Sequence, residues 1–153
     1  MHRINRLFPT TVGAHQVQDF PSIGPKYIYV ARTYTNEEIY VKFTDRYSDE
    51  LHTFCADRKL APALLGFERL HGGWFVVAME KATTGAFPQT LESHQIKAWK
   101  EEIQALVHDF HEEGLVHGDL RPLNFILVPG DTPKMLLVDF DWGGKEGERD
   151  GLR

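Results

Sequence analysis

The sequence predicts an α+β protein in which a small antiparallel sheet precedes a long helix and a loop-rich segment. Four runs rich in β-branched and aromatic residues lie at hairpin spacing, two on each side of a stretch with helical spacing. A longer stretch with helical spacing follows them. Two later apolar runs each lead into a polar cluster with an acid at its centre. The four strand-like runs are 27–31, 38–43, 64–70 and 74–79.

The first helix is predicted over 47–60. Its apolar residues lie on one side, Ser48 is a suitable N-cap, and Pro62 ends the helical pattern. The two flanking hairpins turn through Thr35-Asn36 and through His71-Gly72-Gly73. The order is therefore two strands, a helix and two strands.

The second helix is predicted over about 91–113, with Gly114 as its C′ residue. Its apolar residues recur every three or four positions and form one stripe. Short strands are expected at 125–128 and 134–138, across a turn that contains Pro129 and Gly130. The stripe consists of Ile96, Trp99, Ile103, Leu106, Val107 and Phe110.

Composition excludes several classes of protein. Of the 153 residues, 42% are hydrophobic and 25% are charged, which is typical of a globular domain. A net charge of −5 and the lack of a basic run argue against a nucleic-acid partner. No apolar run is long enough to cross a bilayer, and the N-terminus lacks the apolar core of a signal peptide. No membrane partner is therefore expected. The single cysteine, Cys55, cannot form an internal disulfide, and the expected location is cytoplasmic.

The chemistry of the chain is indicated by the two polar clusters. Asp119 and Asn124 lie five residues apart in the first, and Asp139 begins the second. An acid that orients a hydroxyl, together with an Asn and an Asp that hold a metal ion, is the set that phosphoryl transfer requires. Each residue taken alone also fits a turn or the end of a strand.

These residues resemble the catalytic loop and metal-binding segment of the protein-kinase-like superfamily. His117-Gly118-Asp119 corresponds to H-R-D, Asn124 to the loop asparagine, and Asp139-Phe140-Asp141 to D-F-G. The HGDLRPxN and D-F-D-W patterns, with Gly and Lys after the latter, resemble a fungal kinase-like family. The resemblance implies ATP and Mg²⁺ as cofactors, with Asp119 catalytic and with Asn124 and Asp139 as metal ligands. It also implies that His117 braces the loop from inside.

The resemblance assigns further residues to the nucleotide site. Lys42 matches the strand lysine that contacts the α and β phosphates, and Glu50 is the best candidate for its ion-pair partner. A solvated helix face that contains Asp49 and Glu50 is the alternative. Arg121 lies where protein kinases carry a lysine that contacts the transferred phosphate, although it also fits a surface arginine. The hinge that holds adenine through backbone groups is expected at Met79, Glu80 and Ala82.

Two departures from the superfamily stand out. No G-x-G-x-x-G loop precedes Tyr27, where only Gly13 and Gly24 are available. The printed sequence ends at Arg153, so we expect the helical large lobe to be truncated at its C-terminal side. On that expectation Trp99, Ile103 and Phe110 would be partly uncovered.

The predicted fold is therefore kinase-like, with a small antiparallel-sheet lobe and an incomplete helical lobe. The favoured function is ATP- and Mg²⁺-dependent phosphoryl transfer to a serine or threonine hydroxyl of a protein. Because Gly118 replaces the arginine of H-R-D, a small-molecule phosphotransferase of the aminoglycoside or choline kinase type is the alternative. A pseudokinase that only binds partners is a third reading. The predicted segments are an irregular lead-in (1–26), the small lobe (27–80), a connector (81–90), the partial large lobe (91–144) and a polar tail (145–153).

Overall fold

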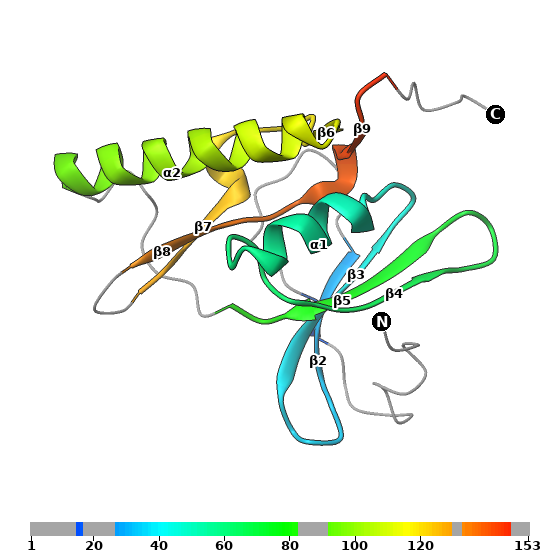
Figure 1. Cartoon of the computed structure of the whole chain (residues 1–153). Helices are drawn as coiled ribbons and strands as arrows, with labels where there is room; N and C mark the ends of the chain where they lie inside the picture. Colours follow the sequence, from blue (N-terminus) through cyan, green and yellow to red (C-terminus); the bar gives the residue numbers. More distant parts are fainter. Residues whose placement is uncertain (1–14, 17–26, 83–91, 130–132, 148–153) are drawn as a thin grey trace.

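The computed structural model describes residues 15–16, 27–82, 92–129 and 133–147 (Figure 1). Most of the predicted lead-in and most of the connector lie outside the described residues, as do Gly13 and Gly24. In the described part of the chain, no helix is long and apolar enough to cross a membrane. The α+β class is confirmed.

A five-stranded antiparallel sheet forms the first part of the molecule, in the order β1-β2-β3-β5-β4. Every predicted strand in this region is present to within a residue or two. The strand β1, which pairs with β2, was not predicted. The strands are β1 (His15–Gln16), β2 (Tyr27–Arg32), β3 (Glu38–Thr44), β4 (Leu64–Arg69) and β5 (Phe75–Glu80).

Alternation along β3 gives the sheet two different faces. Ile39 and Val41 are buried in an apolar cluster that also includes Ala78. Tyr40 and Lys42, which alternate with them, point to the opposite face, where Lys42 is only 4% exposed. The sheet therefore carries an apolar cluster on one side and the phosphate-binding candidate on the other.

Helix α1 (Asp49–Asp57) follows β3 and is capped by Ser48, whose hydroxyl accepts a hydrogen bond from the Leu51 N–H at 3.3 Å. The predicted N-cap is confirmed. The helix ends three residues earlier than predicted, because Lys59 adopts a left-handed conformation with φ 62°. Leu60 N–H then donates to Cys55 O at 3.0 Å, and Lys59 N–H donates to Ala56 O at 2.9 Å. This Schellman motif, rather than Pro62, terminates α1.

Helix α2 (Ser93–Glu112) lies along the far side of α1 from the sheet (Figure 1). Gly114, with φ 70°, follows its C-cap as predicted. The expectation of an uncovered stripe is wrong for Trp99, 7% exposed, and for Phe110, which is fully buried. Both α2 and the α1 residues Leu51 and Cys55 contribute to one apolar core.

Short strands and 3₁₀ turns carry the two polar clusters. The pair β7 (Phe125–Val128) and β8 (Lys134–Leu137) is antiparallel, as predicted. A second pair, β6 (Leu115–Val116) with β9 (Gly144–Lys145), was not predicted, and it places Lys145 in a strand rather than in a polar tail. The 3₁₀ turns are η3 (Pro122–Asn124) and η4 (Phe140–Trp142).

Candidate active site

A cleft lies between the sheet and the loops that carry the polar clusters. Its walls are mostly apolar, and its polar side chains are few. Lys42, Asn124 and Asp139 all line it. So do the three predicted hinge residues, Met79, Glu80 and Ala82. A largely apolar cleft with a few convergent polar groups is the usual form of a small-molecule site.

The register of the sheet explains how one wall of the cleft is built. Ile28 pairs with Lys42 across β2 and β3, and Tyr40 pairs with Met79 across β3 and β5. Residues that pair directly in an antiparallel sheet point to the same face. The lysine therefore lies beside apolar side chains on the cleft face of the sheet.

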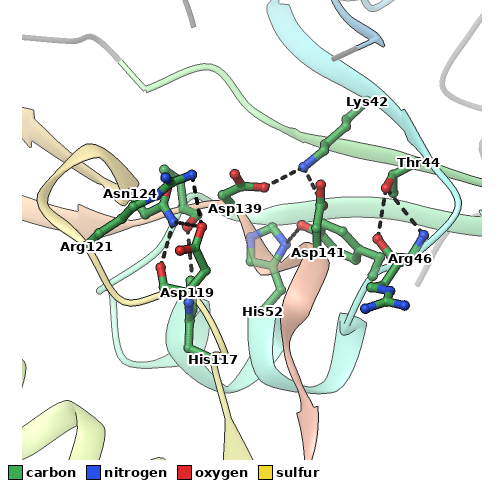
Figure 2. Close-up of polar contacts among 12 residues, drawn as sticks. Lys42, Thr44, Arg46, His52, His117, Asp119, Arg121, Asn124, Asp139 and Asp141 are labelled. Carbon is green, nitrogen blue, oxygen red and sulfur yellow. Dashed lines mark hydrogen bonds and ion pairs between the residues drawn. The ribbon is translucent and has the colours of Figure 1, made fainter. Parts of the chain in front are cut away.

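Lys42 is held by two carboxylates from the D-F-D segment (Figure 2). Its Nζ donates to Asp139 Oδ1 at 2.8 Å and also to Asp141 Oδ1. The Tyr47 ring centroid lies 5.8 Å from the same Nζ. Burial raises the pKa of the Tyr47 hydroxyl well above its usual value, and the negative charges of Asp141 and Asp139 add to this rise.

The expected ion pair between Lys42 and Glu50 is wrong. Glu50 lies in the first turn of α1, with its side chain 58% exposed, and its carboxylate is 3.5 Å from Lys145 Nζ. The buried side of α1 carries Leu51 and His52 instead. The alternative prediction, a solvated face at the start of this helix, agrees with the structure.

The first polar cluster is ordered around Asp119 (Figure 2). Asn124 Nδ2 donates to the Asp119 carbonyl oxygen at 2.7 Å and to Asp119 Oδ2 at 3.0 Å. Arg121 places a guanidinium nitrogen 3.1 Å from the same Oδ2. Both side-chain contacts use Oδ2, so Oδ1 is the carboxylate oxygen that neither contact occupies.

His117 and Gly118 fix the backbone before Asp119. The imidazole of His117 is 1% exposed, and its Nε2 lies 3.3 Å from the carbonyl oxygen of Val138, the residue before Asp139. Gly118 has φ 75°, and a Cβ placed there would lie 2.5 Å from the Trp142 carbonyl oxygen. The two polar clusters therefore touch directly, and only glycine fits at this contact.

Asp139 has a left-handed backbone, with φ 68° and ψ 67°. Such a conformation is uncommon outside glycine, and where it occurs in other residues it often marks a functional site. It leads directly into η4, which turns Phe140 into the core. The ring of Phe140 then stacks on the His52 ring, with centroids 4.5 Å apart.

His52 connects this turn to the loops on either side of α1. Its Nε2 donates to the Pro62 carbonyl oxygen at 2.8 Å, so Nδ1 accepts the hydrogen bond from the Tyr47 hydroxyl at 2.6 Å. Burial lowers the pKa of His52 to about 4, and the charge of Lys42 contributes in the same direction. The imidazole is therefore neutral near pH 7, consistent with one donated and one accepted hydrogen bond.

The donor set of the cleft fits Mg²⁺. The amide nitrogen of Asn124 is engaged with Asp119, so its oxygen is the atom available as a ligand, and Asp139 supplies a carboxylate. No cluster of three or more His, Cys, Asp or Glu side chains that could hold a metal occurs among the described residues. Magnesium typically uses one or two carboxylates together with phosphate and water oxygens, so this small set suits it.

Sequence reasoning missed two features of the site. Asp141 was noted only as part of the D-F-D-W pattern, whereas its carboxylate contacts Lys42. His52 was not considered, although it joins the loops on either side of α1 to η4. The signal for Asp141 was present, because a second acid two residues after Asp139 replaces a residue without a side chain. For His52, a lone histidine in a helix gives no comparable signal.

The described part of the chain has a protein-kinase-like fold. The chain is similar to the kinase PK-1 of Cydia pomonella granulovirus, with a TM-score of 0.68 and 14% sequence identity over 82% of this chain and 53% of that one. The sequence model of the family described as "Lipopolysaccharide kinase (Kdo/WaaP) family" matches residues 71–150, just over half of the sequence. The chain belongs to this family.

Two curated kinases are similar over a shorter stretch. The probable serine/threonine-protein kinase mps1 of Dictyostelium discoideum is 48% identical over 42 residues, and the dual specificity protein kinase TTK of Mus musculus is 45% identical over 42 residues. Each match covers 28% of this chain and 4% of the relative. The chain thus spans about half of the viral kinase and a small part of the curated relatives it matches.

Proposed function

We propose that the chain is an ATP- and Mg²⁺-dependent phosphotransferase that transfers the γ-phosphoryl group to a hydroxyl. The observation that carries this proposal is the cleft in which Lys42, Asn124 and Asp139 meet the hinge residues Met79 and Glu80. A division into a small lobe over 27–80 and a partial large lobe over 91–144 belongs to the same proposal.

The residues of the cleft have distinct roles in this proposal. Asp119, held through Oδ2 by its two neighbours, orients the attacking hydroxyl and accepts its proton as the new O–P bond forms and the bond to the leaving phosphate oxygen breaks. Lys42 binds phosphate oxygens, and Arg121, beside Asp119, is suited to the phosphoryl group in transfer. Asn124 and Asp139 would hold Mg²⁺, which supplies charge neutralisation on the phosphates when bound.

The direct test is phosphate transfer by the Asp119→Asn variant. We expect the rate to fall by roughly 100-fold or more while ATP binding is retained, because the variant lacks the proton acceptor but keeps a side chain of the same shape. The matched control is Asp109→Asn, which removes an exposed carboxylate from α2. Equal activity of the wild type and Asp119→Asn would remove Asp119 from its role. ATP binding without measurable transfer in the wild type would favour a binding module instead.

The favoured acceptor is a serine or threonine hydroxyl of a protein. This choice is supported by the short matches to protein kinases, whereas the name of the family supports a saccharide hydroxyl. Gly118 does not discriminate between them, because its contact with Trp142 explains the glycine by itself. Radiolabelled ATP offered with casein in one reaction and with lipopolysaccharide in another separates the two. Label on lipopolysaccharide alone would overturn the protein acceptor.

A further inference from the structure

Lys42 needs an anionic anchor, because it is almost fully buried. Its side chain is 5% exposed, and an unpaired ammonium at such a position is strongly disfavoured because it loses its hydration. Glu50, in the first turn of α1, was the expected partner, but its carboxylate pairs with Lys145 at the surface. The anchor therefore has to come from another element.

The D-F-D turn supplies it. We propose that Asp141 is the positioning residue for Lys42. It takes the role of ion-pair partner that the sequence had assigned to Glu50 on α1. This inference rests on the proposed function for the role of Lys42 itself. Its basis is the direct contact of Asp141 Oδ1 with Lys42 Nζ, at a position where the side chain of Asp141 is 18% exposed.

The hydrogen-bonding capacity of the ammonium shows why two carboxylates are useful. A lysine Nζ carries three N–H donors. Asp139 and Asp141 accept two of them, so the direction of the third is fixed. In the cleft that Lys42 lines, the third N–H is the donor available for a phosphate oxygen. Asp141 thus orients the ammonium of Lys42 and leaves one N–H donor for the phosphate.

The element that positions Lys42 is the D-F-D turn, whereas the sequence had predicted α1. Asp139 and Asp141 lie at the two ends of Phe140, in one turn that begins with the left-handed Asp139. The position of Lys42 is therefore tied to the segment that carries the metal ligand candidate, and not to the first turn of α1. A glycine at position 141, as in D-F-G, would leave Asp139 as the sole carboxylate on Lys42.

The first test needs no nucleotide. A double-mutant cycle compares the unfolding equilibria of the wild type, Lys42→Met, Asp141→Asn and the double variant. We expect a coupling of about tenfold or more in the unfolding constant, because charge-assisted hydrogen bonds in buried sites contribute on that scale. The matched cycle uses Glu50→Gln, which also removes one carboxylate, and should show no coupling to Lys42. No coupling to Asp141, or equal coupling to Glu50, would overturn the proposal.

The second test measures ATP binding in the presence of Mg²⁺. Asp141→Asn should raise the Kd for ATP by about tenfold, Asp141→Glu should recover part of that loss, and Glu50→Gln should leave the Kd unchanged. An Asp141→Asn variant that binds ATP as tightly as the wild type, or more tightly, would contradict a positioning role. If the wild type itself binds no ATP, the proposed function fails, while the double-mutant cycle still decides whether Asp141 anchors Lys42.

Discussion

At the scale of single residues, the identity of Gly118 is explained by its contact with Trp142, which is distant in the sequence. Its left-handed φ of 75° favours glycine, and the Trp142 carbonyl oxygen occupies the space that a side chain would need. The glycine of the His117-Gly118-Asp119 loop is therefore explained by the course of the backbone after Asp141. Sequence reasoning treated the glycine as evidence about the acceptor, because the contact with Trp142 is invisible without the fold.

Replacing Gly118 with alanine should destabilise the protein by more than the same change at Gly72. Both glycines have positive φ, so both variants incur left-handed strain of about 1–2 kcal/mol. Only at Gly118 does the added Cβ meet another atom, which should add about 1–3 kcal/mol. Urea unfolding of both variants measures the difference. Equal losses would show that Trp142 does not press on this position.

His52 should make the protein less stable as the pH falls. Its pKa is about 4 in the folded protein and 6.5 when unperturbed, so the unfolded state takes up a proton first. The stabilisation is fully present above pH 6.5 and is lost as the pH falls towards 4. At pH 5 the loss from His52 should be about 2 kcal/mol.

Urea unfolding at pH 7 and pH 5 tests this expectation with two variants. His52→Gln should remove most of the pH-dependent difference, and His108→Gln, at an exposed position on α2, should retain it. His117, whose pKa is also lowered by burial, accounts for a residual slope of the same sign. A wild type that is equally stable at both pH values would contradict the burial of His52 as a neutral imidazole.

At the scale of elements, the sequence predicted the periodic segments well and the irregular ones poorly. The strands β2 to β5, β7 and β8, both helices, the Ser48 cap and Gly114 are where their residue patterns indicated. The pair β6 and β9 was missed, because strands of two residues are too short to show alternation. The end of α1 was misplaced, since Lys59 rather than glycine takes the left-handed position.

Helix α1 should become more stable when Lys59 is replaced by glycine. The change relieves left-handed strain of about 1–2 kcal/mol and adds backbone entropy to the unfolded chain, for a net gain of about 0.5–1 kcal/mol. Lys59→Ala is the control, because it removes the charge but keeps the Cβ. Thermal unfolding compares the two. A glycine variant no more stable than the alanine variant would argue against the Schellman motif at this end.

At the scale of the whole molecule, the cleft depends on contacts between segments far apart in the sequence. The core that contains Leu51, Leu106 and Phe140 joins α1, α2 and η4. It holds the two polar clusters against the cleft that the sheet also lines. The identity of the motif residues was visible in the sequence, as was the kinase-like fold. The partner of Lys42 was not, because residues 42 and 141 are adjacent only after folding.

The central claim is that this cleft binds ATP together with Mg²⁺, and ligand-dependent stabilisation tests it most directly. The thermal midpoint of the full chain is measured with ATP and Mg²⁺, with ATP and EDTA, and with Mg²⁺ alone. Asp139→Asn is measured in parallel, with Asp109→Asn as the control for loss of a carboxylate. We predict a rise in the midpoint that needs both ATP and Mg²⁺ and that is lost only in Asp139→Asn. A midpoint that does not respond to ATP and Mg²⁺, or an equal rise in Asp139→Asn, would contradict the account.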